Sequence, residues 1–98
     1  MREADIQRAI IDHLQALGYL VLRLNAGGYR GRTQLLPPGT PDLLALGDNG
    51  EALWFEVKAE DGRLSDAQTA WHERMRWRGH RVEVVRSVEE VDQLIKKG

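Results

Sequence analysis

Hydrophobic and polar residues recur along the chain with periods that predict three helices and four strands. The first helix is predicted over residues 3–17 and ends at Gly18, a typical helix C-cap. Its apolar stripe consists of Ile6, Ile10, Leu14 and Leu17. Strands are predicted over residues 19–25, 42–46, 52–58 and 81–86, and two more helices over 65–78 and from 87 onward. Each of these two helices begins with a capping-box pattern, at Ser65 and Ser87.

This order of elements, αβββαβα, predicts an α/β fold in a single domain of residues 1–98. A helix between two consecutive strands forms a right-handed crossover and makes those strands parallel. We therefore expect a mixed four-stranded sheet flanked by helices. Residues 26–41 form a long connection with four glycines and all three prolines. Loops of this length in a compact domain usually have a function.

The hairpin at Asp48-Asn49-Gly50 decides which residues face each other on the second and third strands. A two-residue Asn49-Gly50 turn would place Asp42 opposite Val57. A three-residue loop with Gly50 in the left-handed conformation would place Asp42 opposite Glu56 instead. We predict the three-residue loop, because it brings two carboxylates and a lysine onto one face of the sheet.

Composition excludes several classes of protein. With 42% apolar and 30% charged residues, the chain can form one small core and is not disordered. It has no apolar run near the roughly 20 residues that span a bilayer and no signal-peptide pattern, so we expect no membrane partner and a cytoplasmic location. The absence of cysteine excludes disulfides, thiolate metal sites and a thiol nucleophile.

The net charge of −1 conceals an excess of arginine, with 11 arginines against 3 lysines. Arginine is suited to forked contacts with phosphate, and a neutral protein can bind nucleic acid if its basic residues converge on one face. A solvated surface is the alternative reading. We predict phosphate contacts from Arg30 and Arg32 in the long loop first, and from Arg74 and Arg78 second.

The strand over residues 52–58 is apolar but carries two charges. Its alternation places Glu56 and Lys58 with Trp54 on one face, opposite Phe55 and its apolar neighbours. A buried, unpaired carboxylate would be costly, so this pair calls for an explanation. One explanation is an ion pair between Glu56 and Lys58 at the end of the strand. The other is a functional site.

Two further polar residues are predicted on inward-facing helix positions. Glu3 projects within about 20° of Ile10 and Leu14, although an acid in a frayed first turn would also suit the helix dipole. Gln68 points inward with Met75, but a capping-box role at Ser65 competes for its side chain.

Three carboxylates and a lysine favour a site for a hard cation, Mg²⁺ or Mn²⁺, with oxygen ligands. Such a site typically supports metal-assisted attack of water on a phosphodiester. Ser65 and Ser87 are better explained as caps, and no histidine lies in a triad or zinc pattern. Gly27-Gly28 is no phosphate-binding fingerprint, so no organic cofactor is expected.

The motifs together resemble the VRR-NUC (virus-type replication-repair nuclease) family of the PD-(D/E)xK nuclease superfamily, and the similarity covers nearly the whole chain as a minimal, standalone member. They are Glu3-Ala4-Asp5-Ile6-Gln7, Pro38-Gly39-Thr40-Pro41-Asp42-Leu43, Phe55-Glu56-Val57-Lys58 and Leu64-Ser65-Asp66-Ala67-Gln68. The resemblance implies a restriction-endonuclease-like core and a divalent-metal-dependent endonuclease.

The resemblance also implies the roles of individual residues. Glu3, Asp42, Glu56 and the Val57 carbonyl would hold Mg²⁺ or Mn²⁺, so that Asp42 and Glu56 belong to the catalytic set. Lys58 would be catalytic, and Gln68 would support the nucleophile or a phosphate. Small standalone relatives are similar to homodimeric DNA nucleases that act on branched DNA such as four-way (Holliday) junctions.

A homodimer has independent support in two apolar features, Trp77 on a helix flank and Leu35-Leu36 in the long loop. Two alternatives to a junction-selective DNA nuclease stay open. One is a non-catalytic nucleic-acid-binding or dimerisation module of the same fold. The other is a nuclease for flap, plain duplex or RNA substrates, since the expected active site does not by itself recognise a 2′-hydroxyl.

Overall fold

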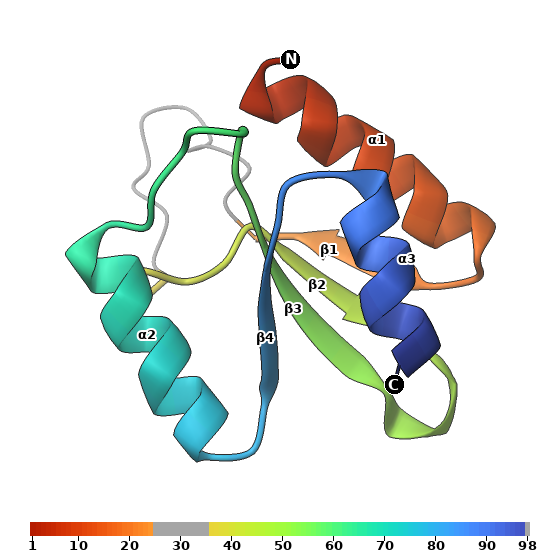
Figure 1. Cartoon of the computed structure of the whole chain (residues 1–98). Coiled ribbons are helices and arrows are strands. Elements are labelled where there is room, and N and C mark those ends of the chain that lie inside the picture. The colour runs from red at the N-terminus through yellow and green to blue at the C-terminus, as the bar shows by residue number, and fades with distance from the viewer. Residues whose placement is uncertain (25–35, 98) are drawn as a thin grey trace, which may run out of the picture.

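A sheet with helices on both faces organises the protein (Figure 1). The computed structural model describes residues 1–24 and 36–97. In these residues the elements are α1 (Glu3–Ala16), β1 (Leu20–Arg23), β2 (Leu43–Leu46), the 3-10 turn η1 (Asp48–Gly50), β3 (Ala52–Val57), α2 (Asp66–Trp77), β4 (Arg81–Val85) and α3 (Val88–Lys97). The four strands of this described part lie in the order β1-β2-β3-β4; β3 and β4 are parallel and the other pairs are antiparallel. The predicted element order and mixed sheet are confirmed.

The hairpin between β2 and β3 has the register expected for a three-residue loop. Leu43 pairs with Phe55, and the ladder runs to Leu46 and Ala52. The Gly47 amide then donates to the Glu51 carbonyl at 2.9 Å, which leaves Asp48–Gly50 as the loop. Gly50 is left-handed as predicted, with φ 77°, and Asn49 shares this conformation with φ 58°. The same register, extended by one residue, brings Asp42 opposite Glu56.

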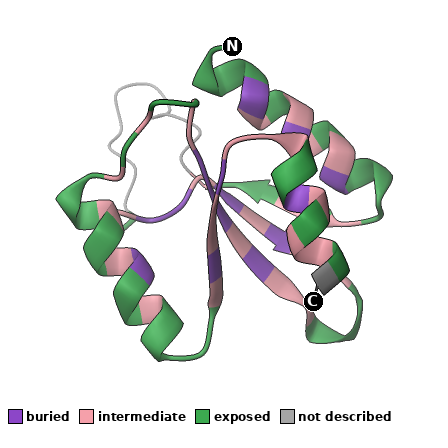
Figure 2. Ribbon diagram, viewed as in Figure 1, coloured by how far each residue is buried: buried purple, intermediate pink, exposed green. Residues whose placement is uncertain are grey.

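The apolar core lies between the sheet and the pair of helices α1 and α3 (Figures 1 and 2). It consists of Ile6, Ile10 and Leu14 from α1, Leu43 and Ala45 from β2, Leu53, Phe55 and Val57 from β3, Val85 from β4 and Val91 from α3. Because strand residues alternate between faces, Trp54 and Glu56 of β3 project to the other side, where α2 lies. The sheet thus separates a core face from a face that carries charge.

Helix α2 is fixed to that second face by one aromatic contact and one arginine. The rings of Trp54 and Trp71 lie 5.3 Å apart in a tilted arrangement. Near the other end of the helix, the Arg76 guanidinium donates two hydrogen bonds, of 2.9 and 2.7 Å, to the Val82 carbonyl of β4. These two contacts hold the middle of α2 against β3 and its last turn against β4.

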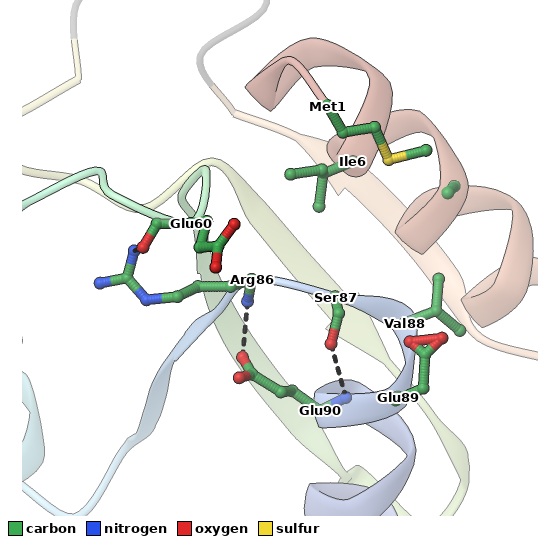
Figure 3. Close-up of a pocket in the computed structure, with 9 residues that line it drawn as sticks. Met1, Ile6, Glu60, Arg86, Ser87, Val88, Glu89 and Glu90 are labelled. Carbon is green, nitrogen blue, oxygen red and sulfur yellow. Dashed lines mark hydrogen bonds between the residues drawn. The ribbon is translucent and has the colours of Figure 1, made fainter.

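The start of α3 differs from the expected capping box (Figure 3). Ser87 Oγ accepts the Glu90 amide at 3.1 Å, as a capping serine should. Glu90 Oε1, however, accepts the Arg86 amide at 2.7 Å, one residue before the cap. The Arg86 side chain also donates to the carbonyls of Ala59 and Gly62, at 2.6 and 2.8 Å. Arg86 therefore joins the start of α3 to the turn that follows Lys58.

Gly39 is required in the turn that leads into β2. Its φ is +89°, and a Cβ there would lie 2.1 Å from the Ala67 carbonyl oxygen of α2. We predict that Gly39→Ala destabilises the protein by about 3 kcal/mol or more, since left-handed backbone strain and a backbone clash add together. Gly79→Ala is the matched control, because Gly79 has φ +95° but open space around it. Urea unfolding measures the stability of both variants. Equal losses of stability would show that the close approach of Gly39 to α2 is unimportant.

Candidate active site

Asp42 and Glu56 form a carboxyl pair on neighbouring strands. Glu56 is 1% exposed, and a side-chain hydrogen bond joins it to Asp42. Asp42 Oδ2 also accepts the Val57 amide at 2.8 Å. The backbone of Asp42 is fixed in turn, because its carbonyl accepts the Leu24 amide at 2.8 Å. The hairpin register thus places two acidic side chains in direct contact at the end of the sheet.

Lys58 and Gln68 both approach the same oxygen of Glu56. Lys58 follows Glu56 by two residues on the same face of the chain, and its Nζ lies 3.9 Å from Glu56 Oε2. Gln68 Nε2 donates to that oxygen at 3.3 Å from the first turn of α2. The lysine side chain is only 12% exposed, so its charge acts in a partly desolvated environment.

The Gln68 side chain has both of the roles considered from the sequence. Its Oε1 accepts the Ser65 amide at 2.9 Å, and Ser65 Oγ accepts the Gln68 amide at 3.2 Å, which completes the capping box. Its Nε2 remains available and donates to Glu56. One amide group therefore caps α2 and holds a carboxylate of the cluster, so the position of Gln68 is set at both ends.

The environment of Glu56 raises the pKa of its carboxyl from 4.5 to about 8. Burial is the largest cause, followed by the hydrogen bond to Asp42 and the negative charge of Asp42. Lys58 acts in the opposite direction, and Glu3 adds a smaller upward shift of the pKa. At neutral pH without a bound cation, the Asp42–Glu56 pair therefore retains a proton between its carboxyls.

Glu3 does not pack against the sheet. It is the first residue of α1, and its side chain is exposed. The expectation of an inward-facing carboxylate is wrong because the apolar stripe is buried only from Ile6 onward, so that the first turn extends past the core. Its charge still acts on Glu56 through space.

The described residues contain no group of three or more His, Cys, Asp and Glu side chains arranged to hold a metal ion. The carboxylates in contact are Asp42 and Glu56, with Glu3 standing apart. Val57, expected to contribute its carbonyl, lies between Glu56 and Lys58, and its amide is bonded to Asp42. A pair of carboxylates and a backbone oxygen remains a donor set of the kind that hard divalent cations prefer.

His72 belongs to the cluster, although the sequence analysis assigned it no role. It is 1% exposed, and its Nε2 lies 3.5 Å from Glu56 Oε1. Burial is the main cause that lowers the pKa of this imidazole, with the charges of Arg76 and Lys58 next. Its position four residues after Gln68, on the same helix face, is the signal that could have identified it.

The arginines predicted to contact phosphate fall in two places. Arg74 and Arg78 are exposed on α2 and, with Trp77, line a surface hollow of about 570 Å³. Arg30 and Arg32 lie outside the described residues, as does Leu35.

Trp77 is 90% exposed and Leu36 37%, so both leave apolar surface uncovered as expected. None of the described helices combines the length and apolar character needed to cross a membrane.

Comparison with known proteins supports the resemblance seen in the motifs. The sequence profile of the VRR-NUC domain matches residues 32–89. A solved structure described as "VRR_NUC domain" is 38% identical with a TM-score of 0.75, over 96% of this chain and 94% of that chain. Another, "VRR_NUC domain protein", is 16% identical with a TM-score of 0.63, over 98% and 86%, and shows likeness of fold alone. No curated protein matches the chain.

Proposed function

The chain belongs to the VRR-NUC family and has a nuclease-type fold, and on this premise we propose that it is a divalent-metal-dependent DNA endonuclease. The observation that carries the proposal is the contact of Asp42 with a fully buried Glu56, beside Lys58 and Gln68. Two ionised carboxylates in contact repel each other unless a proton or a cation lies between them. A cation-binding role explains why a domain of only 98 residues contains this arrangement.

The residues present suit Mg²⁺ or Mn²⁺. Asp42, Glu56 and the Val57 carbonyl would hold the cation, and Glu3 is the further carboxylate whose charge already acts on this site. Glu56 Oε1 is buried without a hydrogen-bond partner among the described residues, so this carboxylate is not fully satisfied by the protein alone. When bound, the cation would activate water and neutralise charge on the phosphoryl oxygens.

Lys58 and Gln68 supply the hydrogen-bond donors of the proposed site. The Lys58 ammonium has three donors, and at 3.9 Å its contact with Glu56 is an ion pair rather than a hydrogen bond, so it can orient a water molecule or a phosphoryl oxygen. Gln68 holds Glu56 through Nε2 and is itself held by the cap at Ser65. It therefore keeps the carboxylate in place while the substrate binds.

Lys58→Met should lower kcat for DNA cleavage about 10²- to 10³-fold, the usual effect of removing a donor that stabilises developing charge. Mn²⁺ binding should be retained, because the ammonium is no ligand. Lys96→Met is the control, since Lys96 is exposed on α3 and far along the chain from the cluster. Single-turnover cleavage and Mn²⁺ titration measure the two properties separately, and wild-type cleavage by Lys58→Met contradicts the assignment.

We further propose that Arg30, Arg32, Arg74 and Arg78 contact the DNA backbone and position the substrate without reading its sequence. Arg74→Ala with Arg78→Ala should reduce the slope of log Kd against log salt by about 2, because each duplex phosphate that an arginine neutralises contributes roughly 0.9. Fluorescence anisotropy at several salt concentrations gives this slope. Arg8→Ala, on the exposed side of α1, is the control. An unchanged slope in the double variant would place the DNA on another surface.

The proposed substrate is branched DNA, with a four-way junction as the leading case, cut by a homodimer with two equivalent active sites. Exposed apolar residues support the dimer, with Trp77 90% and Leu20 61% exposed. A twofold dimer would present its two sites symmetrically to a symmetric junction. Sedimentation equilibrium of the free protein should give twice the chain mass.

One gel assay tests the function as a whole. A four-way junction, a flap, a plain duplex, a single strand and an RNA hairpin are each incubated with Mg²⁺, Mn²⁺ or a chelator. We expect cleavage with either metal, none with chelator, and the fastest cleavage on the junction. Absence of any product would favour a non-catalytic binding module, and equal rates on all substrates would contradict structure selectivity.

A further inference from the structure

A buried histidine lies behind the proposed metal ligand Glu56 and is not used by the chemistry described above. His72 projects from α2 one helical turn beyond Gln68, and it reaches the opposite oxygen of the same carboxylate. Gln68 and Lys58 approach Oε2, whereas His72 Nε2 lies 3.5 Å from Oε1. The carboxylate is therefore held between two groups of neighbours, one on each oxygen.

The buried atoms at this contact lack other partners. Glu56 Oε1, His72 Nδ1 and His72 Nε2 are the buried side-chain polar atoms of the described residues that have no hydrogen bond. Each such atom destabilises the folded protein if it stays unpaired, because it has lost its hydrogen bonds to water. Two of these three atoms already lie 3.5 Å apart, so a shift of a few tenths of an ångström joins them. With a cation bound, Glu56 is an ionised carboxylate that only accepts, so the histidine must be the donor.

We propose that His72 is a positioning residue, whose Nε2–H donates to Glu56 Oε1 and orients this carboxylate for cation binding. The inference rests on the proposed function, because it assumes that Glu56 is a metal ligand. With Oε1 held by His72, Oε2 stays directed toward Lys58 and Gln68. Without this bond, the carboxylate can rotate and exchange its two oxygens.

A neutral ring fits this role better than a charged one. An imidazolium would be a fixed counter-ion to Glu56 and would compete with a cation for its charge. The ring instead lies beside Trp71, edge to face with centroids 6.2 Å apart, and is buried where α2 packs on the sheet. Partners that hydrogen-bond a ligating carboxylate typically contribute 10- to 100-fold to metal affinity.

Two variants separate the hydrogen bond from the volume of the ring. His72→Gln keeps a side-chain N–H at a similar reach, whereas His72→Leu fills a similar space without a donor. Loss of the free Mn²⁺ electron paramagnetic resonance signal measures cation binding without DNA and without catalysis. We expect His72→Leu to weaken Mn²⁺ binding 10- to 100-fold and His72→Gln to stay within about threefold of the wild type. Equal affinities in all three proteins, or equal losses in both variants, would overturn the inference.

The tautomer of His72 is a second readout that needs no substitution. Long-range ¹H–¹⁵N correlation spectra of the wild-type protein saturated with Mg²⁺ distinguish a ring protonated at Nε2 from one protonated at Nδ1. We expect the Nε2–H tautomer, and an Nδ1–H tautomer would overturn the inference. This measurement decides the question even if His72→Leu does not fold.

Asp42→Asn distinguishes failure of this inference from failure of the proposed function. If the metal site is right, Asp42→Asn binds Mn²⁺ much more weakly than the wild type. Normal binding by Asp42→Asn would overturn the metal site and the inference with it. Weak binding by Asp42→Asn together with wild-type binding by His72→Leu would overturn the role of His72 alone.

Discussion

Asp42→Asn should abolish divalent-dependent DNA cleavage, with a loss in kcat of at least about 10³-fold, while the protein stays folded. The size of the loss follows from the two roles that Asp42 is proposed to have, in holding the cation and in stabilising charge during the reaction. The fold should survive because the asparagine Oδ1 can still accept the Val57 amide, which Asp42 accepts at 2.8 Å. The variant also removes a negative charge next to the buried Glu56.

Cleavage is measured as a single-turnover rate with saturating Mn²⁺, and unfolding is measured by urea titration of the same samples. Asp12→Asn, an identical change on the exposed side of α1, should behave as the wild type in both assays. The prediction fails if Asp42→Asn cleaves within about tenfold of the wild type. It also fails if the loss of cleavage is accompanied by unfolding, since the effect would then be structural.

In the absence of divalent cations, the protein should lose stability as the pH rises from 6.5 to 8. The pKa of Glu56 is about 8 in the folded state against 4.5 ordinarily, so the folded protein holds a proton that the unfolded chain has released. Stability falls with pH wherever the folded state binds more protons, here by roughly 1–2 kcal/mol over this interval. The pKa of the buried His72 is lowered, so its ring is neutral in the folded state above pH 6.5 and contributes little to this change of stability with pH.

Glu56→Gln should remove this pH dependence and make the cation-free protein more stable than the wild type at pH 8, because the amide carries no charge to bury. Glu73→Gln, on the exposed face of α2, should keep the wild-type slope. Urea unfolding at intervals of half a pH unit, with chelator present, measures the difference. Saturating Mg²⁺ should stabilise the wild type at pH 8 and leave Glu56→Gln nearly unchanged, since binding to the folded state alone adds stability.

Burial and cation binding have opposite effects on the charge of the Glu56 carboxyl. Burial beside Asp42 disfavours the ionised carboxylate, whereas a bound cation would stabilise it. Lys58 and Gln68 limit the penalty, because each approaches Oε2. The proposed site would therefore be least stable when empty and ionised, which would couple cation binding to the stability of the domain.

Features that depend on near neighbours in the chain could be predicted without the structure. Alternation along β3 separated Glu56 and Lys58 from the core residues Leu53 and Phe55, because successive side chains of a strand point to opposite faces. Local backbone geometry is sufficient for this alternation. It left two hairpin loops open, and the three-residue loop was predicted because it brings Asp42 opposite Glu56, the register that the structure has.

Features that depend on how elements pack together became apparent only in the folded structure. Helical periodicity predicted that Glu3 faces the sheet, but it could not give the position of this turn relative to the sheet, and the turn extends past the core. His72 meets Glu56 only because α2 docks on β3 through Trp71 and Trp54, a contact between residues distant in the chain. Burial is likewise a property of the assembled fold, so the raised pKa of Glu56 could not be derived from its neighbours in sequence.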